Sequence, residues 1–149
     1  MGEDLTSLIR EKFGYETVDA KQYAPLALAF VGDAVYSLLI RTKLLCERER
    51  TVNHLHNHAA DEVKAEAQKE LMTRILPLLT EEETAVFKRG RNAKSYTVAK
   101  HASVTDYRIA TGFEALIGFL YLEGRTDRIM ELVFRQDKEN AAGADERTE

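Results

Sequence analysis

The amino-acid sequence predicts an all-α fold, and three observations support that prediction. Apolar residues recur every three or four positions in several segments, which is the spacing of one face of a helix. No segment alternates between apolar and polar residues for long enough to indicate a strand. The chain has 149 residues but only two prolines and eight glycines, which argues against a turn-rich β fold.

Helical segments are expected at residues 3–13, 25–46, 52–75, 80–90, 103–123 and 126–134. Gly14 is a plausible stop for the first segment, and Pro25 is suited to the first turn of the second. Pro77 ends the third. Thr80 and Glu83 have the spacing of a capping box, which begins the fourth. Residues 25–46 are apolar nearly all round, so we expect this helix at the centre of the domain.

The composition, 44% hydrophobic and 31% charged, fits one compact globular domain. We expect an N-terminal helix and connector at residues 1–20, a helical domain at 21–136 and a polar tail at 137–149. The apolar run at residues 24–40 is at the short limit for a membrane span and contains Asp33, so a buried helix is the preferred interpretation.

The location expected for the chain is the cytoplasm. No N-terminal segment has the pattern of a secretion signal. Cys46 is the single cysteine, so the chain has no intramolecular disulfide framework, which suits a reducing compartment. We expect Cys46 to be a small core residue rather than a nucleophile.

The charge is distributed unevenly. The chain carries a formal charge of −4, yet residues 84–105 contain five basic residues and no acidic one, which leaves −9 on the remainder. Residues 88–95, Lys-Arg-Gly-Arg-Asn-Ala-Lys-Ser, form the densest part of this basic stretch. We expect it to contact the phosphates of a nucleic acid, although an ordinary solvated turn is the alternative.

Two carboxylates lie within otherwise apolar helical segments, Asp33 in residues 26–40 and Glu114 in residues 110–120. Small residues should let these two helices approach closely: Ala27, Ala29, Gly32 and Ala34 on one, Gly112, Ala115 and Gly118 on the other. Two carboxylates in a partly dry site repel each other, which raises a pKa or recruits a cation such as Mg²⁺. Alternatively, each acid bonds a buried polar group or pairs with an arginine such as Arg41 or Arg108.

A row of histidines, His54, His56 and His58, is a third candidate for chemistry. On a helix, His54, His58 and Glu62 follow one another at intervals of four, which could bind a transition metal. The alternative is an exposed polar face, because no metalloprotease motif is present.

The motifs resemble those of a known family. Residues 30–35, Phe-Val-Gly-Asp-Ala-Val, resemble the centre of the ribonuclease III signature, and residues 113–118, Phe-Glu-Ala-Leu-Ile-Gly, resemble that family's second acidic motif. The resemblance is closest to the short branch called Mini-ribonuclease III, which lacks a double-stranded-RNA-binding domain. That branch shares residues 26–34, 88–95 and 107–118, and the resemblance covers residues 23–134.

The resemblance implies an all-α, ribonuclease III-like helical bundle that forms a homodimer. It implies a Mg²⁺-dependent endoribonuclease that cleaves double-stranded RNA to 5′-phosphate and 3′-hydroxyl ends, and that matures the ends of 23S ribosomal RNA precursor. Mn²⁺ is expected to substitute for Mg²⁺. The expected partners are precursor ribosomal RNA, a second copy of the chain and a ribosomal protein that presents the RNA, with no membrane.

The resemblance also assigns roles to residues. Asp33 and Glu114 would be the catalytic residues and the metal ligands. Thr111 and Tyr107 would support these ligands from the next layer of residues. The residues expected to bind RNA are Lys88, Arg89, Arg91, Asn92, Lys94 and Ser95. Leu26, Ala29 and Thr111 occupy positions at which full-length ribonuclease III enzymes have acids, so Asp33 and Glu114 are the two carboxylates that remain.

Two other functions are compatible with the residues. One is a catalytically silent RNA-binding or ribosome-assembly module with the same fold. The other is an all-α, Mg²⁺-dependent nucleotide pyrophosphatase, although such enzymes bind the metal through Glu-x-x-Glu pairs that this chain does not present in an apolar segment.

Overall fold

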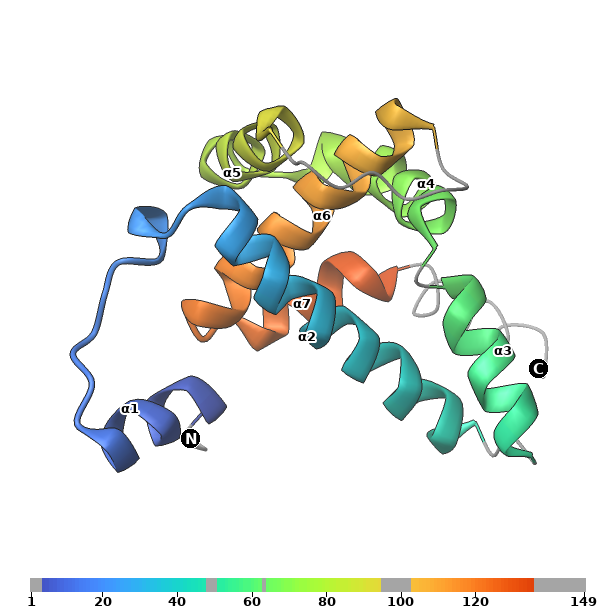
Figure 1. The fold of residues 1–149 in the computed structure, drawn as a ribbon, viewed down its shortest axis with the longest axis horizontal. Helices are drawn as coiled ribbons and strands as arrows, with labels where there is room; N and C mark the ends of the chain where they lie inside the picture. The colour runs from blue at the N-terminus through green and yellow to red at the C-terminus, as the bar shows by residue number, and fades with distance from the viewer. Residues whose placement is uncertain (1–3, 48–50, 63, 95–102, 136–149) are drawn as a thin grey trace, which may run out of the picture.

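The computed structural model describes residues 4–47, 51–62, 64–94 and 103–135 (Figure 1). These residues form seven α-helices, two short 3₁₀ turns and no strand, which confirms the all-α prediction. The elements are α1 (Leu5–Phe13), η1 (Ala20–Gln22), α2 (Pro25–Cys46), α3 (Val52–Glu62), α4 (Ala65–Ile75), η2 (Leu76–Leu78), α5 (Glu81–Asn92), α6 (Val104–Leu122) and α7 (Thr126–Val133).

The central helix is α6, not α2 as expected. α6 packs against α2, α4, α5 and α7, and every residue from Ala115 to Leu120 is buried. α2 packs along α6 and buries Leu28, Tyr36 and Ile40 on that side, but its opposite side is exposed in the single chain. α2 is long and apolar enough to cross a membrane by length and composition alone, a test that core helices also pass. One side of α2 packs on α6, but only 28% of that apolar window is buried in the single chain.

Glycines allow two close helix contacts on α6. A Cβ at Gly32 of α2 would overlap the backbone carbonyl of Glu114, and a Cβ at Gly118 would overlap that of Leu28. The predicted approach of the two acidic helices is therefore present. Gly112 was expected to face α2, but it packs instead on Phe87 of α5, because α6 is enclosed on more than one side.

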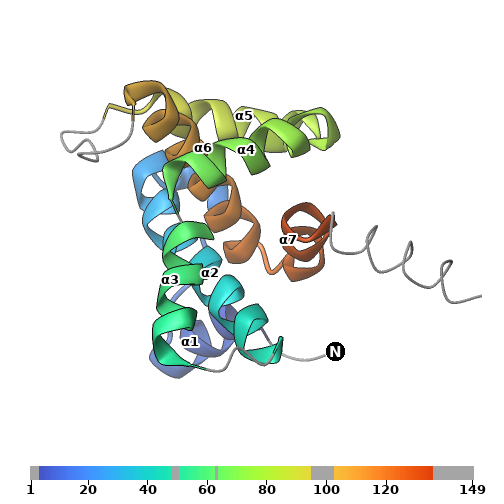
Figure 2. The same ribbon diagram turned by 90° about the vertical axis from the view of Figure 1, so that its right-hand side faces the viewer.

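The expected single helix at residues 52–75 is wrong, because the chain forms α3 and α4 separately. Lys64 has an extended backbone, with φ −63° and ψ 148°, and precedes the first turn of α4. α3 packs on α2 whereas α4 packs mainly on α6, so the chain must change direction between them (Figure 2).

The α5 helix begins at the predicted capping box. The Thr80 side-chain oxygen accepts a hydrogen bond from the Glu83 backbone N–H at 3.1 Å, and the Glu83 carboxylate accepts one from the Thr80 N–H at 2.9 Å. The helix was predicted to end near Gly90, and it continues two residues further, to Asn92. Gly90 lies inside the helix because its missing side chain allows close contact with Gly112 and Ala115 of α6.

The N-terminal helix α1 begins at an Asp4 cap and ends at Gly14, whose φ of 70° favours glycine. Leu8, Ile9 and Phe13 of α1 are exposed, whereas Thr6 is buried and Asp4 lies against Gly124. α1 thus lies beside the helical body at the end of an extended connector (Figure 1).

Candidate active site

Asp33 and Glu114 are brought together by the contact between α2 and α6. Gly32, the neighbour of Asp33, packs against the backbone of Glu114 itself. Glu114 is partly buried, but Asp33 is exposed, so the expectation of a buried Asp33 is wrong for the single chain. The reason is that no described element covers the outer side of α2.

The electrostatics of Glu114 reflect this position. Burial raises the pKa of the Glu114 carboxyl to about 8, the negative charge of Asp33 adds to the rise, and a hydrogen bond from Gln68 opposes it. None of these causes is an arginine or lysine. Arg41, one of the two arginines considered as partners, donates instead to Ser37 of its own helix at 3.2 Å, and Arg108 is exposed. The repulsion between the two carboxyl groups is therefore relieved by a proton on Glu114 or by a bound cation, and a cation that binds here would displace that proton.

Gln68 is a site residue that the sequence analysis missed. It comes from α4, its exposure is 1%, and its side chain donates a hydrogen bond to the Glu114 carboxylate. A sequence signal for it existed, because Gln68 falls on the same helical stripe as the core residues Leu71, Met72 and Ile75. A long polar side chain on an apolar stripe requires a buried partner.

Thr111 and Tyr107 lie three and seven positions before Glu114, on the same side of α6. The Thr111 hydroxyl donates to the Tyr107 backbone carbonyl at 2.9 Å. Its oxygen lone pairs can still accept a hydrogen bond, so Thr111 can support a polar group near Glu114.

The basic residues lie close to the same turn of α6. Gly90 contacts Ala115 and the Thr111 carbonyl, so the last turns of α5 run beside the segment that carries Glu114. Lys88, Arg89, Arg91 and Asn92 are on these turns, and Lys94 follows as an exposed residue. The expected basic loop is thus mostly helical. Ser95 lies outside the described residues.

Arg91 is held in place by its neighbours. Its guanidinium carbon lies 5.6 Å from the centre of the Phe87 ring, and its Nε donates to the Asn92 side chain at 3.2 Å. A partly ordered arginine loses less conformational freedom on binding a phosphate than a free one does.

The remaining candidates from the sequence gain little support. His54 and His58 face each other across one turn of α3, with ring centres 6.0 Å apart, but no cluster of three metal-ligating side chains occurs in the described part of the chain. The Glu62 side chain, the third member of that set, lies outside it. Cys46 is exposed, so its assignment to the core is wrong.

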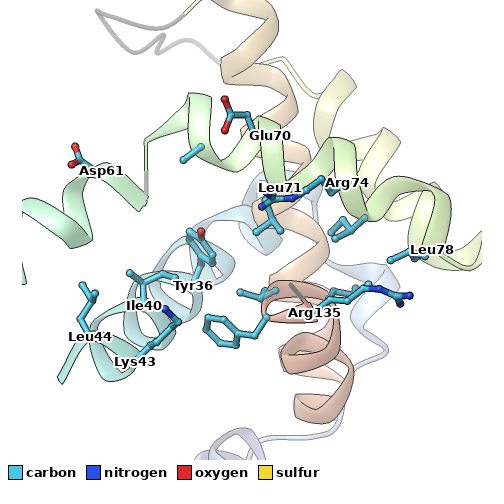
Figure 3. A pocket seen from close by; sticks show the side chains of 15 residues that line it. Tyr36, Ile40, Lys43, Leu44, Asp61, Glu70, Leu71, Arg74, Leu78 and Arg135 are labelled. Atoms are coloured by element: carbon cyan, nitrogen blue, oxygen red, sulfur yellow. The ribbon is translucent and has the colours of Figure 1, made fainter. Parts of the chain in front are cut away.

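A hollow of about 690 Å³ lies between α2, α4 and α7, away from the two carboxylates (Figure 3). Its lining includes Tyr36, Lys43, Glu70, Arg74 and Arg135, and it contains neither Asp33 nor Glu114. The candidate active site is therefore a surface site rather than this pocket.

Comparison with known proteins decides the family. A family model for the ribonuclease III domain matches residues 26–125. A Mini-ribonuclease 3 of Thermoanaerobacter sp. (strain X514) is 52% identical over 110 residues, which is 74% of this chain and 78% of that protein. Another, of Clostridium tetani, is 50% identical over 127 residues, 83% of this chain and 84% of that protein. The chain belongs to the Mini-ribonuclease 3 family. It is also similar to the crystal structure of a Fusobacterium nucleatum protein, with a TM-score of 0.73 and 30% identity over 82% of this chain and 98% of that one.

Membership of the Mini-ribonuclease 3 family makes the chain an endoribonuclease that acts on double-stranded RNA, as the resemblance implied. The ribonuclease III family generally depends on a divalent metal ion. The matched residues 26–125 include Asp33, Glu114 and the basic end of α5, and they exclude α1. The assignment favours the nuclease over the nucleotide pyrophosphatase.

Proposed function

We propose that Asp33 and Glu114 bind Mg²⁺ and that the chain uses it to cut double-stranded RNA, leaving 5′-phosphate and 3′-hydroxyl ends. The observation that carries this proposal is the contact of Gly32 with the Glu114 backbone, which brings Asp33 close enough for its charge to raise the Glu114 pKa. Mg²⁺ prefers oxygen ligands and is often bound by one or two carboxylates together with water and phosphate. The donor set of this chain therefore fits Mg²⁺, and Mn²⁺ should substitute for it.

Each group of residues then has a defined task. When bound, the metal ion supplies Lewis acidity and positive charge for the attack of water on the phosphodiester. Asp33 and Glu114 supply the oxygens that bind it, and the contact between Gly32 and Gly118 holds their helices together. Thr111 accepts a hydrogen bond from a group at the site.

The basic end of α5 is the proposed RNA contact. Lys88, Arg89 and Lys94 are exposed, and they continue from the turn that packs against the Glu114 segment. An RNA strand whose phosphates bind these residues would continue toward the two carboxylates. Duplex RNA is recognised mainly through its shape, its 2′-hydroxyls and its phosphates, so we expect little sequence preference.

The proposed active unit is a homodimer that pairs through the outer side of α2. Phe30 is 82% exposed, Leu38 61% and Leu45 63%, and Ala34 between them is also exposed. These residues share one face of the helix, and Asp33 lies at its edge. An apolar face of this kind is costly in water. A second copy covering it would also bring both active sites close to one interface.

The proposed biological substrate is the paired end of 23S ribosomal RNA precursor in the cytoplasm, where a ribosomal protein would present the RNA. Support comes from the family, whose other members carry the name Mini-ribonuclease 3. A double-stranded stem closed by the two ends of the precursor is the kind of substrate that a pair of basic surfaces can grip.

The deciding experiment is to incubate the protein with a long RNA duplex, with and without Mg²⁺, and to map the product ends. We expect metal-dependent cuts with 5′-phosphates, and we expect Asp33→Asn to lose them while remaining folded. Wild-type cleavage rates in Asp33→Asn would overturn the site assignment. RNA binding without cleavage by the wild-type chain would support the catalytically silent module instead. A precursor ribosomal RNA stem, used as a second substrate, tests the proposed biological target.

A further inference from the structure

Gln68 is a polar side chain enclosed in the core beside Glu114. It lies in the first turns of α4 with an exposure of 1%, and Leu71, Met72 and Ile75 of the same helix are buried beside it. Burying an amide side chain is unfavourable unless it is hydrogen-bonded. Its amide N–H donates to the carboxylate of Glu114, whereas its Oε1 accepts no hydrogen bond from the described residues.

We propose that Gln68 is a positioning residue, whose amide N–H holds the Glu114 carboxylate in the orientation needed to bind the metal ion. This inference rests on the proposed function, in which Glu114 is a metal ligand. A glutamate side chain has several rotatable bonds, and a fixed donor restricts them before the ion arrives. Gln68 acts through Glu114 and needs no contact of its own with the ion or the RNA.

The chemical nature of the donor suits this task. An amide N–H is neutral, so it orients the carboxylate without cancelling its charge. An arginine in the same place would form a two-point ion pair with Glu114 and compete with the metal ion. The structure thus supplies a hydrogen bond without a positive charge that would compete with the metal ion for the carboxylate.

Contacts on either side of Gln68 help to place α4 on α6. The Lys69 ammonium lies 2.9 Å from the Asp106 carboxylate, which joins the start of α4 to the start of α6. The core side chains of α4 pack on α6 as well. Together these contacts fix the register between α4 and α6, so Gln68 meets Glu114 at a defined point.

The test replaces Gln68 by methionine, which has nearly the same length and shape but no donor. Mg²⁺ binding is measured by calorimetry without RNA, and cleavage is measured as a function of Mg²⁺ concentration. We expect Gln68→Met to weaken Mg²⁺ binding about 10–100-fold, with the cleavage rate recovering at saturating Mg²⁺. The melting temperature of the metal-free protein is measured in parallel to show that the variant is folded.

The matched control is Met72→Leu, a volume-conserving change on the same buried stripe of α4. It should leave Mg²⁺ binding within about twofold of wild type, because it removes no hydrogen bond. An equal loss in both variants would mean that only the packing of α4 matters, and this would overturn the inference. Unchanged Mg²⁺ binding in Gln68→Met would overturn it too.

A second background shows whether Gln68 acts through Glu114. Glu114→Asp keeps the charge but shortens the side chain, so the hydrogen bond to Gln68 is lost. In that background Gln68→Met should cause no further loss of Mg²⁺ binding, whereas a further loss of about tenfold would contradict the proposal. If the wild-type chain neither binds Mg²⁺ nor cleaves the duplex, the proposed function fails first. If the wild-type chain does both, and Gln68→Met binds Mg²⁺ and cleaves the duplex as well as wild type, only the inference about Gln68 fails.

Discussion

Gly32 of α2 lies directly against the backbone carbonyl of Glu114 in α6, at a separation that leaves no room for a side chain. The residue after Gly32 is Asp33. One backbone contact therefore sets how closely the two proposed metal ligands approach. The requirement for glycine in this motif follows from the geometry of two helices in contact, not from the flexibility of the chain.

The first prediction concerns this contact. Gly32→Ala should lower the free energy of unfolding by about 3 kcal/mol, because the new methyl group must push against backbone that cannot move aside. It should also abolish most cleavage, since separating α2 from α6 moves Asp33 away from Glu114. Urea unfolding and a duplex cleavage assay measure the two effects. Ala27→Ser, at an exposed position of the same helix, is the control and should change neither.

The second prediction concerns pH. The pKa of Glu114 is raised to about 8, so in the metal-free folded chain this carboxyl keeps its proton at pH values where the unfolded chain has lost it. Stability must then fall as pH rises from about 4.5 to about 8. Glu114→Gln removes this dependence. It should stabilise the metal-free protein by about 1–3 kcal/mol at pH 8 and by much less at pH 5.

Urea unfolding in the presence of a metal chelator, at pH 5, 7 and 8, measures this difference. Glu70→Gln, at an exposed position of α4, is the matched control and should shift stability by less than about 0.5 kcal/mol. A Glu114→Gln protein that is no more stable than wild type at pH 8 would show that Glu114 is not penalised in the folded state.

The third prediction concerns the RNA contact. On the inactive Asp33→Asn background, replacing Arg91 and Lys94 by alanine should weaken duplex binding. It should also reduce the slope of log affinity against log salt concentration by about 2, one for each phosphate that the variant no longer neutralises. Arg10 and Lys12 on α1 provide a control pair with the same change in charge. An equal reduction in slope for both pairs would mean that overall charge, rather than this surface, binds the RNA.

The fourth prediction concerns the homodimer. Phe30→Glu should weaken self-association about 100-fold, because it places a charge at the most exposed large side chain of the apolar face of α2. Sedimentation at several protein concentrations measures the effect. Phe13→Glu replaces an exposed phenylalanine on α1 and should leave the dimer intact. Wild-type protein that sediments as a monomer at high concentration would contradict the proposed interface.

Much of the local structure could be predicted from the sequence, because it depends on neighbouring residues. The bounds of α2, the Thr80 capping box and the start of α6 at its Ser103 cap follow from side chains within one turn. The predictions differ from the structure at features that depend on residues far apart in the sequence. The break at Lys64 follows from α3 and α4 packing on different helices, and the extension of α5 past Gly90 follows from its contact with α6.

The proposed site could be predicted from the sequence alone, from two carboxylates in apolar helices, glycines that allow those helices to meet, and a basic stretch without acids. The packing of distant helices was needed to establish that α6 is the central helix, that Asp33 is exposed at the edge of an apolar face, and that Gln68 of α4 reaches Glu114. The spacing of apolar residues predicts which side of a helix is buried. It does not predict which side chains of other helices pack against that side, and those contacts set the burial, charge and hydrogen bonds of Glu114.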